Sequence, residues 1–264
     1  MDFHSMIAKL RKYPTAAAVL VFSAVFSFLL APAELLRNID FYLVWVLSVL
    51  FALHIWCHFK EDRSYRVSGI VPAWLELIAG TLLLFFCPVR EISLIFIMLA
   101  VSSYAAGIIF SVKMTGPLVL LLGVAPNLER INLILSDVMS RTFRNIYFFA
   151  SNNEPDVART IQEAVPLSNS SLLLWAMLLA VFPLAVFLCK TAYERFSMYC
   201  ITFIAYFFCD LLRYLLIQTS PGDFSNTATA WSSFGIALIL GTAFIAGLLY
   251  AVNTLTKKEG DEKK

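Results

Sequence analysis

Two charged residues three positions apart, Asp210 and Arg213, are the strongest candidates for chemistry in this chain. They lie near the C-terminal end of the apolar run 197–217. A spacing of three places both side chains on one face of a helix, close enough to pair. Arg213 can present a permanently charged, rigid set of donors to an anionic intermediate or a carboxylate. The plainer alternative is an ion pair that only stabilises the structure.

Glu76 is the second candidate, because it stands in the middle of the apolar run 67–87. Ionisable residues inside a bilayer are costly and face the interior of a helix bundle. Glu76 can bind a proton or a coupling ion there, or it can hydrogen-bond a neighbouring helix through Ser102, Ser103 or Tyr104. We therefore assign it to binding.

These residues sit in a chain with the composition of an integral membrane protein. Of its 264 residues 60% are hydrophobic and 14% are charged, whereas soluble domains carry roughly a quarter charged residues. The formal net charge of +2 gives no indication of nucleic-acid binding. None of the five cysteines forms a CxxC pair or a zinc-type spacing. We expect an all-α polytopic membrane protein with no soluble catalytic domain, no nucleic-acid partner, no cofactor and no metal ligand.

Eight apolar runs are candidates for membrane-spanning helices, which need about 20 apolar residues to cross about 30 Å of hydrocarbon. Seven are long enough. The eighth, 114–126, is short and is framed by Gly116, Pro117 and Pro126. The predicted spans are 15–33, 41–59, 67–87, 92–112, 114–126, 171–189, 197–217 and 230–253.

The distribution of lysine decides whether 114–126 is a crossing. Cytoplasmic loops are enriched in Lys and Arg. Lys9 and Lys12 precede the first run and several lysines follow the last, so both ends should be cytoplasmic and the number of crossings even. With eight crossings every lysine, including Lys113 between the fourth and fifth, lies on the cytoplasmic side. We therefore predict a single transmembrane domain over 1–264, surrounded by lipid in a bacterial inner membrane.

The first run allows an alternative, a cleaved signal peptide. Two lysines, the apolar stretch after them and Ala31-Pro32-Ala33 together resemble a signal sequence with an A-x-A cleavage site. Cleavage would leave the other seven orientations unchanged.

The one sizeable stretch outside the membrane is the outer loop, 127–170. Its first half, 127–150, repeats apolar residues with helical periodicity, and charged residues lie between them. That pattern is typical of an amphipathic helix on a membrane surface. We expect an outer cap over the helices, not an enzyme domain. The apolar positions are 128, 131, 134, 135, 138, 139, 146 and 149.

The order of features over 116–250 resembles that of the exosortase/archaeosortase family. Members are eight-span membrane cysteine transpeptidases that process C-terminal sorting signals on the outer face. In the family a short apolar helix ending in proline precedes an outer amphipathic stretch, as at 116–126 and 127–150 here. The resemblance implies an eight-helix bundle with its site at the outer face.

The three family motifs are matched only in part. Asp210-Leu-Leu-Arg213 has the spacing of Asn-x-x-Arg, with Asp in place of Asn. Trp231 stands where the histidine of His-x-x-x-Gly is expected, and the segment from Ser168 to Ser170 stands where Cys-Ser-Gly is expected. Of the catalytic Cys–Arg–His set only the arginine, Arg213, is retained.

These losses indicate a degenerate relative. Cysteine proteolysis needs a thiolate held beside a base, and neither a Cys nor a His accompanies Ser168 and Ser170 on the outer side. We expect a catalytically degenerate exosortase-like protein with a binding or assembly role in envelope protein sorting or exopolysaccharide export. Its partner would be a transmembrane sorting-signal helix or another membrane protein, and we assign Asp210 and Trp231 to binding.

Two alternatives stay open. In the first, the protein is an active membrane peptidase or transpeptidase in which Ser168, Ser170 or a displaced cysteine, Cys87 or Cys209, works with Arg213. Under this alternative and under the binding hypothesis, the serines, Arg213 and Trp231 should converge at one outer-facing pocket. In the second, the protein is a small transporter or a subunit of a membrane complex, and Glu76 lines a polar pathway together with the Asp210–Arg213 pair.

Overall fold

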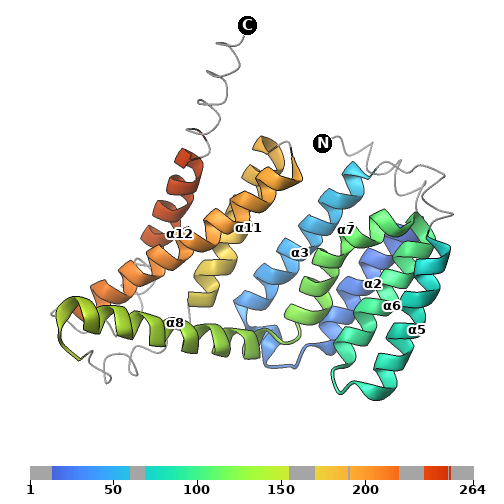
Figure 1. The fold of residues 1–264 in the computed structure, drawn as a ribbon, viewed down its shortest axis with the longest axis horizontal. Helices are drawn as coiled ribbons and strands as arrows, with labels where there is room; N and C mark the ends of the chain where they lie inside the picture. The colour runs from blue at the N-terminus through green and yellow to red at the C-terminus, as the bar shows by residue number, and fades with distance from the viewer. Residues whose placement is uncertain are drawn as a thin grey trace, which may run out of the picture. The chain divides into compact units, whose positions relative to one another are not determined.

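The computed structural model describes residues 14–59, 69–154, 170–189, 191–219, 235–248 and 250. Every regular element in these ranges is helical (Figure 1). The all-α class is thereby confirmed for the described part of the chain. The chain divides into two compact units, Met1–Ile131 and Asn132–Lys264.

The first unit consists of helices joined by short connections. The predicted runs 15–33, 41–59 and 67–87 are all helical, and their ends shift by at most a few residues. The elements are α2 (Pro14–Leu30), η1 (Leu35–Arg37), α3 (Ile39–His58), α5 (Ile70–Phe86), α6 (Arg90–Ala106), α7 (Ile108–Leu118) and the π-helical turn η2 (Val119–Val124).

The continuous helix formed by α7 and η2 is the core of this unit. Phe110, Met114, Leu118 and Leu122 recur every fourth residue and are completely buried. They pack against α2, α3 and α6, which contribute Ala16, among other residues, to the same cluster. A helix with one continuous apolar stripe must bury that stripe against its neighbours, and here three neighbours surround it.

The chain reverses between α6 and α7 at Gly107. This residue has φ 89° and ψ 165°, a conformation that glycine adopts without steric cost. The reversal comes earlier than predicted, because Lys113 had been placed in a cytoplasmic turn between spans 92–112 and 114–126. Lys113 instead lies inside α7 with its side chain exposed. The fifth apolar helix therefore covers residues 108–124 and is about 25 Å long.

The C-terminal part of this helix is irregular for identifiable reasons. Pro117 has no N–H to donate to the preceding turn. In η2 the hydrogen bonds span five residues, as in the one from Ala125 N to Leu120 O of 2.9 Å. Beyond the turn at Pro126, the next helix, α8 (Leu128–Ser151), is bent by 91° from the axis of residues 108–124. The carbonyl of Gly123 accepts a hydrogen bond from the Asn127 side chain at 3.1 Å.

Helices α5 and α6 form an antiparallel pair that depends on small residues. A Cβ atom on Gly80 would lie 3.0 Å from Ile97 Cγ1 and 3.2 Å from Ile97 N. The Ser93 hydroxyl donates to the Gly80 carbonyl at 2.6 Å. At the other end of α5, a Cβ atom on Gly69 would collide with the carbonyl oxygen of Ser103. Small residues are the usual means by which membrane helices approach closely.

The second unit contains most of α8, then α11 (Ser170–Leu188), α12 (Ala192–Thr219) and a helix over residues 235–248. Residues 171 to 175 of α11 are all buried. A helix that is hydrophobic on every side is usually buried, and the sequence of α11 has no polar face. Helix α12 is α11's antiparallel neighbour, since only residues 189–191 connect them.

Helix α8 has the predicted amphipathic character but a narrower buried face. Leu128 and Phe143 are completely buried. Three of the apolar positions named in the sequence analysis, Ile134, Val138 and Phe149, are exposed. The buried positions lie on one side of the helix and the charged ones on the opposite side, whereas Val138 and Phe149 lie between these two sides. Such flanking residues suit the boundary between protein, lipid and water.

Length and hydropathy identify three helices of the described chain that can cross a membrane. They are Ile39–His58, Ser171–Leu188 and Tyr193–Leu215, and a fourth crossing results if the bent pair Ile108–Val124 and Leu128–Ser151 is one span. Helices α2, α5 and 235–248 are also apolar but shorter. These apolar helices support a membrane protein, and eight crossings stay a prediction.

We expect the α5–α6 contact to fail in the Gly80→Leu variant. The added side chain must displace Ile97 and the α6 backbone, which costs about 1–3 kcal/mol and lowers the apparent Tm by several degrees. Gly247→Leu is the matched control, because no atom lies within 4 Å of a Cβ there. Thermal unfolding of both variants in detergent measures the difference. Equal Tm values would show that α5 does not pack on α6 through Gly80.

Candidate functional site

A row of polar side chains occupies the buried face of α12. Tyr206, Asp210, Tyr214 and Gln218 follow one another at intervals of four, and all are buried together with Arg213. The opposite face is exposed and apolar, with Phe203, Ile204, Phe208 and Leu212. Polar side chains of a membrane helix turn to the protein interior, because lipid offers them no hydrogen bonds. The sequence analysis identified Asp210 and Arg213 in this row but missed Tyr206, Tyr214 and Gln218, although their spacing of four was visible.

Asp210 and Arg213 form the predicted ion pair. Nη1 of Arg213 lies 3.9 Å from Oδ1 of Asp210, and their side chains are 3% and 1% exposed. Two charges removed from water attract each other strongly, yet the attraction must offset several kcal/mol of desolvation per ion. Such a pair is expensive to break and not in itself stabilising. A buried ion pair within a row of buried polar side chains marks this face of α12 as the candidate functional site.

The pair lies at the level of the N-terminal end of α11. Ser170 is 18 residues before Leu188, where α11 ends, and Asp210 is 18 residues after Ala192, where α12 begins. Because the two helices run antiparallel from a short connection, Ser170 and Asp210 are level. Ser168 and Trp231 lie outside the described residues, as does the side chain of Ser170. Their convergence on Arg213 therefore stays a prediction.

The helix of residues 235–248 packs against α11 and α12 close to the ion pair. A Cβ atom on Gly241 would lie 2.5 Å from Met177 Cε of α11 and 3.4 Å from Cys209 Sγ of α12. The absence of a side chain at Gly241 leaves this space to the end of Met177 and to Cys209. Since Cys209 precedes Asp210, three helices meet beside the ion pair. Cys209, one of the two cysteines considered as a displaced nucleophile, packs at this junction as a free thiol.

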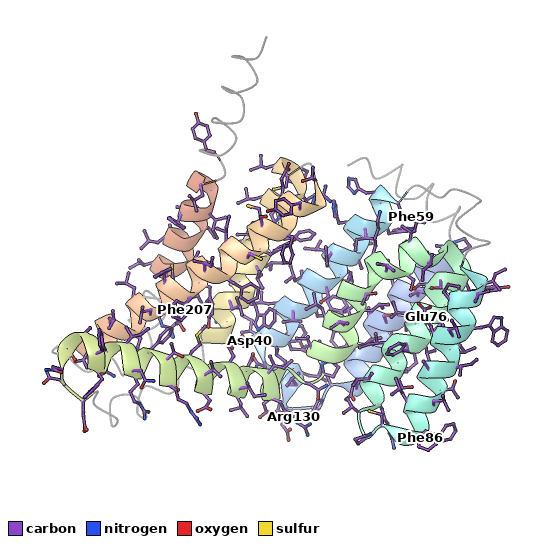
Figure 2. The ribbon with its side chains drawn as sticks, viewed as in Figure 1. Asp40, Phe59, Glu76, Phe86, Arg130 and Phe207 are labelled. Carbon is purple, nitrogen blue, oxygen red and sulfur yellow. The ribbon has the colours of Figure 1, made fainter. Side chains whose placement is uncertain are left out.

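Helix α8 covers the same part of α12. The ring centroid of Phe143 lies 5.4 Å from that of Phe207 and 5.7 Å from that of Tyr214 (Figure 2 labels Phe207). Tyr214 directly follows Arg213, so the amphipathic helix contacts α12 where the ion pair lies. Phe143 was missed in the sequence analysis, because it stands alone between Thr142 and Arg144 in a charged stretch.

Glu76 belongs to a separate polar contact in the first unit. Ser111 Oγ donates to Leu99 O at 3.1 Å and lies 3.5 Å from Glu76 Oε1. The predicted partners on α6 are not used: the Ser102 hydroxyl donates to Met98 O at 2.8 Å, and Tyr104 is exposed. The partner comes from α7, which no local spacing could have indicated. Glu76 lies in the first unit and Asp210 in the second.

Metal chemistry has no obvious location among the residues that the structure describes. No three side chains of His, Cys, Asp or Glu in these ranges lie close enough to hold an ion.

Cys87, the other cysteine considered as a nucleophile, follows α5 as a free thiol.

Comparison of the chain with family models, with curated proteins and with solved structures gives no match. The site is therefore interpreted from its own geometry, and the motif resemblance over 116–250 stays a prediction.

We expect the two charges of the site to depend on each other. Arg213→Met leaves Asp210 buried without its cation and should cost about 3–5 kcal/mol, whereas the double variant Asp210→Leu with Arg213→Met should recover most of that loss. Thermal unfolding of the wild type, Arg213→Met and the double variant in detergent measures these changes in stability. The exposed pair Asp137–Arg141, with Nε and Oδ1 2.9 Å apart, is the matched control and should change by less than about 1 kcal/mol. A double variant as unstable as Arg213→Met alone would contradict the pairing.

Proposed function

We propose that this chain is a multi-pass membrane protein of exosortase type that binds a transmembrane sorting segment without cleaving it. The observation that carries the proposal is Arg213, buried beside Asp210 where α11, α12 and the helix of residues 235–248 meet. Of the three catalytic residues in the family motifs, this chain retains the arginine and lacks the cysteine and the histidine. A protein that retains the arginine but lacks the nucleophile and the base can still recognise a segment.

Arg213 suits the outer end of such a segment. A C-terminal sorting helix that crosses inward presents its N-terminal turn on the outer side. Carboxylates are favoured at a helix N-terminus, because the dipole is positive there. The planar guanidinium of arginine binds a carboxylate through two parallel hydrogen bonds. Asp210 would keep Arg213 oriented until the segment arrives.

The inventory of reactive groups favours binding over cleavage. The sequence contains three histidines, at positions 4, 54 and 58, and all precede the second unit. A serine nucleophile such as Ser170 needs an adjacent base. The carboxylate nearest to it along the α11–α12 register is Asp210, which is held by Arg213. The active-peptidase alternative therefore requires a base other than histidine and other than the arginine-paired Asp210.

Eight crossings are part of the proposal. The eight proposed crossings are α2, α3, α5, α6, residues 108–124, α11, α12 and residues 235–248. Helix α8 is excluded, because one side of it is charged. Helices of 17 residues reach about 25 Å, and bilayers adapt to a mismatch of a few ångströms. Lipid would surround exposed side chains such as Phe86 of α5. Both termini would be cytoplasmic in a bacterial inner membrane.

Reporter fusions test this topology. We expect alkaline phosphatase, active only outside the cytoplasm, to be active after Val89 and after Asn153. We expect green fluorescent protein to fluoresce after Arg63 and after Thr191, because lysine-rich connections stay inside. An inactive phosphatase after Asn153 together with an active one after Val89 would show that residues 108–124 do not cross.

Capture of a tagged protein with a C-terminal sorting segment tests the binding function. Arg213→Lys retains the charge but loses the planar fork, so we expect roughly ten- to hundredfold weaker binding, as for the loss of one charged hydrogen bond. Arg141→Lys, on the exposed face of α8, should bind as the wild type does. Thermal unfolding of the same preparations separates lost binding from lost folding.

The same mixture decides between binding and catalysis. The proposal expects an intact substrate after incubation with the wild-type protein. Cleavage that disappears in Ser170→Ala would replace the binding function by a serine-dependent peptidase. Equal capture by Arg213→Lys and the wild type would remove Arg213 from the site.

A further inference from the structure

Aromatic rings separate α2 from α3 at the end where η1 connects them. The ring centroid of Phe28, on α2, lies 5.3 Å from that of Phe41 and 5.2 Å from that of Trp45, both on α3. The Trp45 indole N–H donates to the carbonyl of Ala24 on α2 at 3.4 Å. The distance between two packed helices depends on the side chains at their contact. These rings therefore set a wide separation and fix the register of the pair.

Further along the pair, the facing side chains are too small to fill this separation. On α2 the next residues of the same face are Ala24 and Val21, and on α3 the next one is Val49. A cavity of about 150 Å³ lies between the two helices and is lined by these residues. Leu121 of the π-helical turn η2 closes the back of it and is 1% exposed.

The lining of this cavity suits hydrocarbon and not water. Every lining residue is apolar, and the one polar group that Trp45 carries, its indole N–H, already donates to Ala24 O. A buried water needs two to four polar partners, and apolar cavities stay dry. An empty cavity deprives its lining of dispersion contacts. An apolar cavity of about 150 Å³ engineered into another protein holds benzene, so about six carbon atoms fit in this volume.

The cavity opens to the exposed apolar surface of the first unit. Val21 lines it and is 61% exposed, whereas Val49 is partly buried. Phe22 and Val25, which are close to Val21 on α2, are also exposed and apolar. Val49 is the eleventh of the 20 residues of α3, so the opening lies near the middle of this span. At that depth of a bilayer the surrounding medium consists of acyl chains.

We propose that this cavity, the α2–α3 groove, binds the terminal part of a phospholipid acyl chain. An acyl chain restores the dispersion contacts that an empty groove loses. Its entry has no desolvation cost, because the chain moves from one apolar medium into another. The lining offers no partner for a headgroup, so the groove selects the chain. The bound chain end fills the space that the aromatic rings leave between α2 and α3.

The groove is independent of the proposed binding function. It belongs to the first unit alone, whereas the Asp210–Arg213 pair belongs to the second. Failure of one proposal therefore leaves the other unchanged. An apolar side chain from a second copy of this protein is the other occupant of suitable chemistry, and the experiment separates the two.

The test is photolabelling of the full-length protein in phosphatidylcholine–phosphatidylglycerol vesicles. One probe is a phosphatidylcholine with a diazirine at the end of an acyl chain, and a second probe carries the diazirine beside the ester. Light expels N₂, and the carbene inserts into a neighbouring C–H bond. Because the groove lies at mid-span, the terminal probe should label Val49 at least about fivefold more than the second probe. An unlabelled Val49, or equal labelling by the two probes, overturns the proposal.

A filled groove should exclude the chain. Ala24→Phe places a ring inside it and should lower the labelling of Val49 by the terminal probe at least about fivefold. Val25→Phe is the matched control, since Val25 is 50% exposed and does not line the groove. Label on the exposed Leu29 should be the same in both variants. Thermal unfolding shows whether Ala24→Phe is folded, and the comparison of the two probes on the wild type decides without it.

Two outcomes would contradict the assignment. Equal labelling of Val49 in Ala24→Phe and Val25→Phe would show that the label does not come from the groove. A wild-type protein that is unlabelled at Val49, and that can be cross-linked to a second copy through Val21, would assign the groove to a contact between copies.

Discussion

A polar group in a bilayer has no water to bond, and this constraint decides which side of each helix faces the protein. It explains why Tyr206, Asp210 and Tyr214 share the buried face of α12 while phenylalanines occupy the other. It also explains why serine and threonine hydroxyls, such as those of Ser48 and Thr202, donate to carbonyls four residues earlier in their own helices. The charged residues obey the same constraint in two ways. Asp210 has a cation as its partner, and Glu76 has a hydroxyl.

Close approach between helices is the second requirement, because lipid and leucine are equally apolar and hydrophobicity alone does not join membrane helices. Gly80 lets α5 contact α6, and Gly241 lets the helix of residues 235–248 contact α11 and α12. Each of these contacts lies near an ionisable residue. Gly80 shares the buried face of α5 with Glu76, and Gly241 packs on Cys209, which precedes Asp210. Each of the two candidate sites thus lies beside a helix contact that a glycine makes.

The two sites suggest a division of roles within one chain. The second unit holds an arginine oriented by an aspartate, which suits the recognition of an anionic group. The first unit holds the carboxyl of Glu76, whose Oε1 lies 3.5 Å from Ser111 Oγ in the irregular helix of residues 108–124. Proline and a π-helical turn interrupt that helix, and such breaks are frequent at functional sites.

Within the described residues the helical segments could be predicted from sequence, because long apolar runs are typical of membrane helices. The sequence also indicated the Asp210–Arg213 pair, since a spacing of three is a local property of a helix. The turn at Gly107 was placed six residues too late, because the position of a lysine indicates a side of the membrane and not the residue at which the chain reverses. A positive φ at one glycine fixed that residue.

The contacts between residues far apart in the chain are visible only in the folded structure. Ser111 is 35 residues from Glu76, and Phe143 meets Phe207 and Tyr214 across two helices. Periodicity shows which face of a helix is buried but not which helix covers it, because any apolar face can pack on any other. The choice depends on where glycines permit close approach and where polar groups find partners, and both are properties of the assembled bundle.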